Sequence, residues 1–269
     1  MITSGKYLIL ILLFSSYVFK TKAQTADIQL FNQLNDADWK TSFTASKADW
    51  TESWLLDGER GSVKNTPEGM VFSAGPIRGD NGSHNVLWTK VEFTGDVKIE
   101  FDYTRLDDIN YAVNILYILA TGVGEEPYHR DITRWSHLRV VPYMNRYFRY
   151  MNLLHISYAA YPLEDDPEAD YVRARRYPVP SGGNFSRDTQ LSPDYYNTGL
   201  FKPGITYHFT AIKRGDDLML RVENKEEKID KFFHWDTSGF DPVTEGRIGI
   251  RHMYTRAARY ANLTVFETI

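Results

Sequence analysis

Residues 97–103 read Val97-Lys98-Ile99-Glu100-Phe101-Asp102-Tyr103, an unbroken alternation of apolar and polar side chains. Successive side chains of a β-strand point to opposite faces, so the four apolar residues share one face and the three charged residues share the other. This stretch therefore predicts a strand with one face against a hydrophobic core and the other face in water.

Similar short segments occur along most of the chain, at residues 85–88, 113–117, 154–158, 207–212, 218–222, 246–252 and 263–266. Helical periodicity is scarce, and a short helix or strand is expected only over 25–35. Many short antiparallel strands at fairly regular spacing predict an all-β fold, a sandwich or jelly roll of two antiparallel sheets. Residues 122–150 and 161–205 are rich in Pro, Arg, Tyr and Asp and are expected to form long loops.

The composition excludes several classes of protein. The chain has 269 residues, no cysteine and a formal net charge of -4. The absence of cysteine excludes disulfide scaffolds, thiolate zinc sites, iron–sulfur clusters and a cysteine nucleophile. The slightly acidic balance argues against a nucleic-acid partner, because nucleic-acid binders normally carry a basic excess. No linker, repeat or composition break divides residues 24–269, which are therefore expected to form a single domain.

The first residues have the pattern of a secretory signal peptide over 1–23. Lys6 precedes an apolar run that extends to Phe19, and Thr21-Lys22-Ala23 supplies small residues for cleavage. The run is shorter than the roughly 20 apolar residues that a membrane-spanning helix needs. We therefore expect an exported protein, periplasmic or secreted, without a membrane partner after cleavage. Loss of three lysines would change the net charge from -4 to -7.

Positive charge and aromatic rings gather in two segments. Residues 128–161 contain five arginines, six tyrosines, three histidines and a single acid, Asp131. The second segment, 170–178, places Arg173, Arg175 and Arg176 beside Tyr177. Arginine suits the forked binding of carboxylate or sulfate, and aromatic rings suit the apolar faces of a sugar. Any single arginine could equally be a solvent-exposed surface charge or form an ion pair with the acidic residues 164–168. The arginines taken together predict an anion-binding cleft.

Three histidines are candidates for proton transfer, because histidine titrates near neutrality. His155 alternates with Leu154 and Ile156 on an expected strand and so faces away from them. His84 comes just before an expected strand, and His252 ends another. Each of them has a structural role as its alternative. The chain contains no metalloprotease, P-loop, nucleophile-elbow or EF-hand motif.

The segments Gly246-Arg247-Ile248-Gly249-Ile250-Arg251-His252-Met253 and Tyr260-Ala261-Asn262-Leu263-Thr264-Val265 together resemble a known family. The pattern is similar to that of the YesU-like family of concanavalin-A-like (lectin/glucanase-type) jelly-roll proteins associated with polysaccharide degradation. Val86-Leu87-Trp88 and His155-Ile156-Ser157-Tyr158 also fit, so the resemblance spans most of residues 84–266. It implies a jelly roll of two antiparallel sheets with long loops, and a role with carbohydrate.

The first functional hypothesis is a lyase that performs β-elimination on a uronate-containing oligosaccharide or polysaccharide, with or without sulfate groups. Arginine would neutralise the carboxylate, one side chain would take the C5 proton and another would protonate the group leaving C4. The candidate catalytic residues are His155, Tyr158, His84 and Arg175. The candidate substrate-binding residues are Trp88, Arg134, Tyr143, Arg173, Arg176, Tyr177, Arg251 and His252. In a regular strand Tyr158 points away from His155, so this pair would need a bulge or a strand end.

Two other functions remain open. A glycoside hydrolase needs two carboxyl groups at the scissile bond, and Glu100 and Asp102 share one face of their strand. A non-catalytic carbohydrate-binding protein would need only the arginines and the aromatic rings. In each case the expected partner is an anionic oligosaccharide or polysaccharide, and no cofactor is expected. The acidic residues of 164–170 suggest calcium, but no ligand spacing supports it.

Overall fold

The computed structural model describes residues 26–162, 166 and 168–268. The chain forms two units, which are residues 1–38 and residues 39–269. In the first unit residues 26–35 are helical. Of the two alternatives expected for 25–35, a short helix or a strand, the structure has the helix. The predicted signal peptide over 1–23 lies outside the described residues. Among the residues described, no helix is long and apolar enough to cross a membrane.

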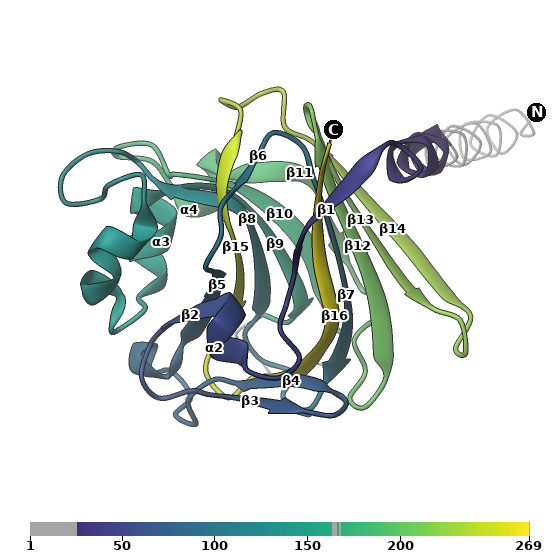
Figure 1. The fold of residues 1–269 in the computed structure, drawn as a ribbon, viewed down its shortest axis with the longest axis horizontal. Helices are drawn as coiled ribbons and strands as arrows, with labels where there is room; N and C mark the ends of the chain where they lie inside the picture. Colours follow the sequence, from purple (N-terminus) through teal and green to yellow (C-terminus); the bar gives the residue numbers. More distant parts are fainter. Residues whose placement is uncertain (1–25, 163–165, 167, 269) are drawn as a thin grey trace, which may run out of the picture. The chain divides into compact units, whose positions relative to one another are not determined.

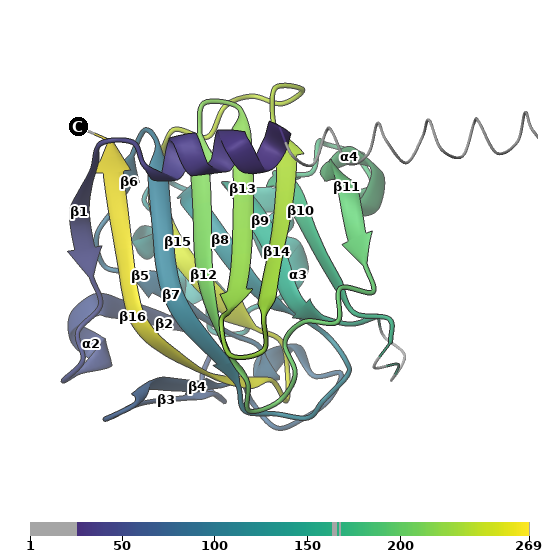
Figure 2. The ribbon, with the colours of Figure 1, turned by 90° about the vertical axis from the view of Figure 1, so that its right-hand side faces the viewer.

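The second unit contains two antiparallel sheets of eight strands each. In the first sheet the order is β14-β13-β12-β7-β16-β4-β3, and β1 also pairs with β16. Several of these strands run side by side in Figure 2. Their bounds are β1 Trp39–Thr44, β3 Ser62–Thr66, β4 Gly69–Ser73, β7 Val97–Arg105, β12 Thr206–Arg214, β13 Asp217–Asn224, β14 Ile229–Asp236 and β16 Ala257–Thr268.

The second sheet has the order β11-β10-β9-β8-β15-β5-β2, and β6 also pairs with β15. Its strands are β2 Trp54–Asp57, β5 Asn85–Thr89, β6 Phe93–Thr94, β8 Asn114–Gly122, β9 Met151–Ala160, β10 Tyr171–Tyr177, β11 Gln190–Tyr196 and β15 Glu245–His252. The short helices of this unit are α2 Trp50–Ser53, η1 Asn81–Ser83, η2 Ile132–Arg139, α3 Met144–Tyr150 and α4 Phe185–Asp188. The prediction of an all-β fold of two antiparallel sheets is confirmed.

Both predicted long loops contain regular structure. Residues 122–150 include η2 and α3, and residues 161–205 include β10, α4 and β11. The prediction of a loop over 161–205 was wrong because β10 carries buried charges, which disguise a strand in the sequence. Arg175 and Arg176 are only 2% and 6% exposed in β10 because each has a hydrogen-bond partner distant in sequence.

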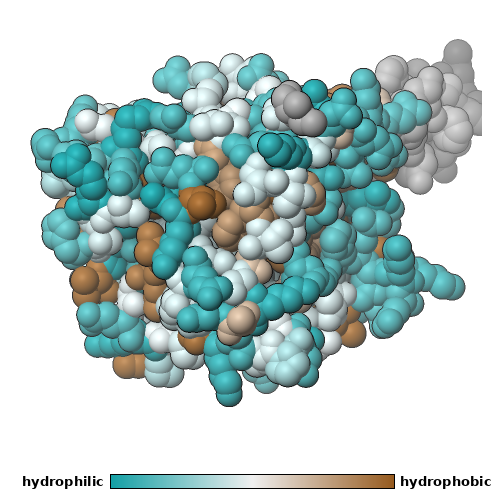
Figure 3. Space-filling view, viewed as in Figure 1, coloured by the Kyte–Doolittle hydropathy of each residue, from teal (hydrophilic) through white to brown (hydrophobic). Residues whose placement is uncertain are grey.

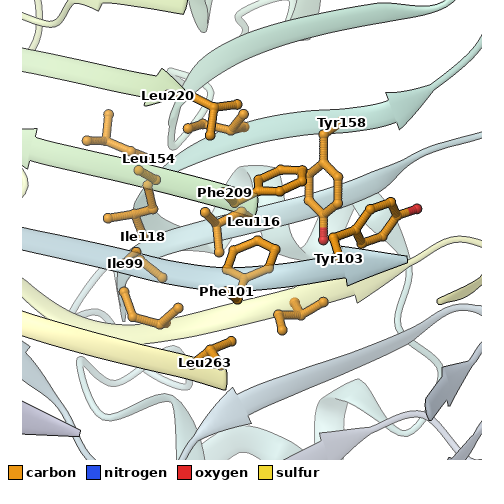
Figure 4. Packing of buried hydrophobic residues seen from close by; sticks show 14 of the residues in the cluster. Ile99, Phe101, Tyr103, Leu116, Ile118, Leu154, Tyr158, Phe209, Leu220 and Leu263 are labelled. Atoms are coloured by element: carbon orange, nitrogen blue, oxygen red, sulfur yellow. The ribbon is translucent and has the colours of Figure 1, made fainter. Parts of the chain in front are cut away.

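The main core lies between the two sheets. Ile99, Phe101 and Tyr103 of β7 are fully buried in it, which confirms the alternation predicted for this strand. The ring of Phe101 stacks on Phe209 of β12 with centroids 4.6 Å apart, and Tyr158 of the second sheet packs edge-on against Tyr103 (Figure 4). Aromatic residues therefore fill much of the space between the sheets.

The outer face of the second sheet is buried as well. A second cluster combines Trp88, Ile115 and Tyr117 of the sheet with Trp135 and Tyr147 from residues 122–150. Figure 1 shows α3 on this outer side of the sheet. We call residues 122–150 the covering segment. Because the covering segment buries the outer face of the second sheet, all nine residues of β8 are buried. The covering segment also forms part of a pocket.

A candidate ligand pocket on the outer face of the second sheet

A pocket of about 760 Å³ opens on the outer face of the second sheet. Its floor comes from β8, β9 and β10, and its walls come from α3, α4 and the segments after β9 and β15. Most lining side chains are apolar or aromatic, and they include Met144, Phe148, Tyr161, Tyr171, Phe185, Tyr196 and Met253. The polar side chains that line it are His155, Ser157, Arg173 and Asn197. A largely apolar pocket with a few polar groups is the usual form of a ligand site.

The pairing of the strands brings the polar residues of the floor together. Ser157 of β9 lies opposite Ile115 of β8 on one side and Arg173 of β10 on the other. His155 lies two residues earlier in β9, opposite Tyr117 and Arg175. Side chains two residues apart in a strand share a face, so His155 and Ser157 both point outward, as the sequence predicted for His155.

His155 is held by a hydroxyl group at each ring nitrogen. Its Nδ1 lies 2.7 Å from the Tyr177 hydroxyl, and its Nε2 lies 2.6 Å from the Ser157 hydroxyl. Burial lowers the pKa of His155 well below its ordinary value, and the charges of Arg173, Arg175 and Arg251 act in the same direction. The imidazole is therefore neutral at neutral pH, with one nitrogen donating and the other accepting.

Arg173 lines the pocket and has no carboxylate partner among the described residues. Its guanidinium lies 4.5 Å from the centre of the Tyr171 ring, and its buried Nε has no hydrogen-bond partner. By contrast, Arg175 makes two hydrogen bonds to Asp194, of 2.7 and 2.9 Å. Among the described residues that line the pocket, Arg173 thus carries the positive charge that a ligand could neutralise.

Asp57 fastens the covering segment to the sheet. This buried carboxylate accepts hydrogen bonds from Arg139 Nε at 2.5 Å, Trp88 Nε1 at 2.7 Å and the Tyr147 hydroxyl at 3.0 Å. Arg139 and Tyr147 belong to the covering segment, whose helix α3 also supplies Met144 and Phe148 to the pocket wall. Asp57 was not among the sequence candidates, because its partners lie 31 to 90 residues away.

Trp88 has a structural position rather than the expected substrate-binding one. Its ring is 1% exposed and stacks on Tyr117 with centroids 5.3 Å apart. It lies over Gly249 of β15, where an added Cβ would be only 2.4 Å from the indole ring. Glycine at this position therefore leaves room for the tryptophan ring. Trp88 is not among the residues that line the pocket.

Arg251 and His84 form an internal contact away from the pocket lining. Arg251 is fully buried and donates from Nη2 to His84 Nδ1 at 2.7 Å and to the Pro142 carbonyl at 2.5 Å. Its guanidinium lies 4.5 Å from the centre of the Tyr147 ring. Burial, followed by the charge of Arg251, lowers the pKa of His84 to about 3. The two residues hold β15 to the segment before α3.

Tyr158 and His252 face the core between the sheets. The Tyr158 hydroxyl lies 2.7 Å from the Tyr260 hydroxyl, and His252 Nε2 lies 2.7 Å from the same atom. Figure 4 shows Tyr158 among the core side chains. The register of β9 against β10 shifts between Ser157 and Ala160, but Tyr158 still faces the core, so the expected pair of Tyr158 and His155 is not formed.

The remaining predicted residues do not form one arginine cleft. Arg176 donates from Nε and Nη2 to the Asp241 carbonyl, at 3.0 and 2.9 Å, and does not line the pocket. Arg134 in η2 and Tyr143 before α3 are exposed and lie outside the pocket lining. Of the residues expected to bind substrate, Arg173 lines the pocket. Tyr177 lies on the same outer face and is hydrogen-bonded to His155, but it does not line the pocket.

The candidate hydrolase carboxylates lie on the other sheet. Asp102 of β7 is 2.9 Å from His208 Nδ1 and accepts a hydrogen bond from Asn262, and Glu100 pairs with Lys98 at 3.0 Å. Neither carboxylate lines the pocket around His155. Within the described ranges, no three His, Asp or Glu side chains gather in a way that could hold a metal ion.

No protein-family model matches the chain, and no curated protein matches its sequence. Solved structures do match. A protein of unknown function with a galectin-like fold from Bacillus subtilis is 17% identical with a TM-score of 0.57, over 86% of this chain and all of that one. Lectin UEA-II complexed with galactose is 8% identical with a TM-score of 0.53, over the same shares. The exoplasmic/lumenal domain of VIP36, with Ca²⁺ and Man3GlcNAc bound, is 11% identical with a TM-score of 0.52, over 86% of this chain and 90% of that one.

These similarities confirm the predicted jelly-roll fold. At this level of identity they concern the fold alone. The resemblance to the YesU-like family stays a prediction.

Proposed function

We propose that this protein binds a uronate-containing saccharide in the pocket on the outer face of the second sheet. The observation that carries the proposal is the placement of Arg173, a cation without a carboxylate partner among the described residues, in a pocket with aromatic and apolar walls. The signal-like sequence over 1–23 adds export to the proposal, so that the ligand would be met outside the cytoplasm.

Each part of the pocket suits one part of such a ligand. Phe148, Tyr171 and Phe185 offer flat apolar surfaces to the C–H faces of sugar rings. Arg173 offers charged N–H donors to a carboxylate, and Ser157 and Asn197 offer hydrogen bonds to hydroxyl groups. The solved structures with the same fold include a lectin complexed with galactose and a domain bound to Man3GlcNAc, which supports a saccharide as the ligand class.

Replacing Arg173 by methionine should weaken the binding of oligogalacturonate about 10- to 100-fold, because a hydrogen-bonded carboxylate loses its charged donor. The comparison ligand is the matching oligogalactoside, which has no carboxylate. Methionine keeps apolar contact with Tyr171, so binding of this neutral ligand should change little. Isothermal titration calorimetry with both oligosaccharides measures the difference. Arg134→Met is the matched control, since Arg134 is exposed and outside the pocket, and it should bind like the unaltered protein.

Two results would contradict this proposal. Equal affinity of the unaltered protein for charged and neutral oligosaccharides would remove the role of the carboxylate. Equal loss of affinity in Arg173→Met and Arg134→Met would show that overall charge, rather than the pocket, attracts the ligand.

A second candidate function, β-elimination, is favoured by the position of His155. This histidine lines the pocket and is hydrogen-bonded to the Tyr177 and Ser157 hydroxyls, which could pass a proton. Burial is the main cause of the low pKa of His155, and the charge of Arg173 lowers it further. A carboxylate bound at Arg173 would offset that charge and make the imidazole a better base. His155 would then take the C5 proton as the C4–O bond breaks and a double bond forms between C4 and C5, and the oxygen leaving C4 would take up a proton from solvent.

Replacing His155 by glutamine should abolish any formation of unsaturated uronate while retaining ligand binding. Glutamine keeps a polar group in the pocket but cannot act as a base. The ultraviolet absorbance of the unsaturated product measures the reaction, and calorimetry measures the binding. Full activity in His155→Gln would remove the elimination mechanism. Binding without any product in the unaltered protein would leave only the binding function, and new reducing ends without absorbance would indicate a hydrolase.

A further inference from the structure

A smaller cavity adjoins the pocket around Arg173. Its volume is about 280 Å³, and Tyr161 and Asn197 line both cavities. Its other walls come from the end of β7, the residues after β7, the residues before β10 and the segment after β11. This volume is close to the lower end of the roughly 300–1,000 Å³ of ligand pockets, which suits a ligand part such as one sugar ring. A ligand at Arg173 that extends past Tyr161 and Asn197 therefore enters this cavity.

Four charged residues line the smaller cavity in the described part of the chain, and two of them are occupied by internal hydrogen bonds. Asp170 is 4% exposed and accepts three hydrogen bonds, from the N–H and hydroxyl of Thr198 and from the N–H of Gly199. Arg105 is 1% exposed and donates five hydrogen bonds, which go to Asp107, Tyr161, Phe201, Ile109 and Asn110. A guanidinium has five N–H groups, so Arg105 has none left for a ligand.

The other two charged residues of the lining, Glu168 and Lys202, are exposed and have no ion-pair partner among the described residues. The Glu168 carboxylate only accepts hydrogen bonds, and the Lys202 ammonium only donates them. A sugar hydroxyl group can serve both, because it donates and accepts. A second ligand carboxylate would gain the attraction of Lys202 but would meet the like charges of Glu168 and Asp170.

The two adjoining cavities therefore differ in charge. The described lining around Arg173 contains no acidic side chain, so that pocket has a net positive charge. In the smaller cavity the two cations, Arg105 and Lys202, are matched by the two carboxylates. Tyr161 is fixed at the junction, because its hydroxyl accepts a hydrogen bond of 2.7 Å from Arg105.

We propose that the ligand is a mixed saccharide in which a uronate is linked to a neutral sugar. The uronate carboxylate lies at Arg173, and the neutral sugar occupies the smaller cavity, with its hydroxyl groups at Glu168 and Lys202. This inference rests on the proposed function and adds the neighbour of the uronate to it.

The test is isothermal titration calorimetry of the full chain with galacturonate and with three α-1,4-linked disaccharides, namely digalacturonate, galacturonosyl-galactose and galactosyl-galacturonate. At least one of the two mixed disaccharides should bind about tenfold more tightly than galacturonate, because the second ring gains hydrogen bonds to charged groups. It should also bind about two- to fivefold more tightly than digalacturonate, whose second carboxylate meets like charges at an exposed site.

Two substitutions in the smaller cavity separate its contribution from that of Arg173. Lys202→Met should weaken binding of the preferred mixed disaccharide about tenfold and leave that of galacturonate unchanged. Glu168→Gln should strengthen binding of digalacturonate about two- to fivefold, because it removes a like charge and keeps an acceptor. Glu226→Gln is the matched control, since Glu226 is exposed and lies outside the linings of both cavities.

Three results would overturn the inference: no mixed disaccharide binds more tightly than galacturonate, digalacturonate binds most tightly, or Glu168→Gln and Glu226→Gln act alike. Arg173→Met distinguishes this failure from failure of the proposed function. If Arg173→Met binds galacturonate as tightly as the unaltered protein does, the proposed function fails. If Arg173→Met loses affinity for galacturonate but the second sugar adds none in the unaltered protein, only the inference about the smaller cavity fails.

Discussion

Replacing Asp57 by alanine is expected to lower the free energy of unfolding by about 3–5 kcal/mol, which is the cost of leaving a buried charge without its partner. Asp57 alone among the described carboxylates pairs with Arg139, whose side chain is 1% exposed. The substitution also removes the acceptor of the Trp88 and Tyr147 hydrogen bonds. Urea unfolding followed by tryptophan fluorescence measures the loss.

Asp57→Ala should also reduce ligand binding, because Arg139 and Tyr147 hold the covering segment and its helix α3 forms part of the pocket wall. Asp230→Ala is the matched control: Asp230 forms an exposed pair with Arg221 and should contribute less than about 1 kcal/mol. A cost for Asp57→Ala no larger than that of Asp230→Ala would contradict the role given to Asp57.

The second large effect is a loss of stability in acid. Burial lowers the pKa of both His84 and His252 to about 3, and it lowers that of His155 as well. In the unfolded chain these histidines titrate near 6.5, so below pH 6.5, and down to about pH 3 for His84 and His252, the unfolded state binds protons that the folded state does not. Their contribution to stability is therefore complete above pH 6.5 and is lost as the pH falls through this window.

As the pH falls from 6.5 to 3, His84 and His252 should each lower the free energy of unfolding by about 1.4 kcal/mol per pH unit. His84→Gln should reduce the slope by about one proton, because glutamine does not titrate and can still accept from Arg251. Urea unfolding at a series of pH values measures the slope.

His208→Gln is the control. The hydrogen bond from His208 to Asp102 raises the pKa of His208, so its contribution is lost as the pH rises rather than as it falls. If the free energy of unfolding of His84→Gln falls with pH below 6.5 as steeply as that of the unaltered protein, His84 does not contribute to the loss of stability in acid.

In the view of Figure 3 the surface is mainly hydrophilic, and hydrophobic residues emerge in small separate patches. Exposed apolar side chains such as Ile77, Val91 and Leu106 are scattered among the elements, which is ordinary for a protein surface.

The sequence determined the fold class of this protein and the face on which His155 lies. Apolar and polar residues alternate from Val97 to Tyr103, and a strand side chain points either to the core or away from it. The order of neighbouring residues is therefore enough to predict a strand and the face on which each of its side chains lies. The aromatic surplus also proved informative, since rings such as Phe101, Tyr103 and Phe209 fill the core while others form the pocket walls.

Only the tertiary structure decided which charged residues are free. Arg173, Arg175 and Arg176 are nearly adjacent in the sequence, but Asp194 neutralises Arg175 and the Asp241 carbonyl holds Arg176, which leaves Arg173 in the pocket. The physical reason is that a side chain's direction follows from local periodicity, whereas its hydrogen-bond partner is set by strand pairing between residues far apart in the chain.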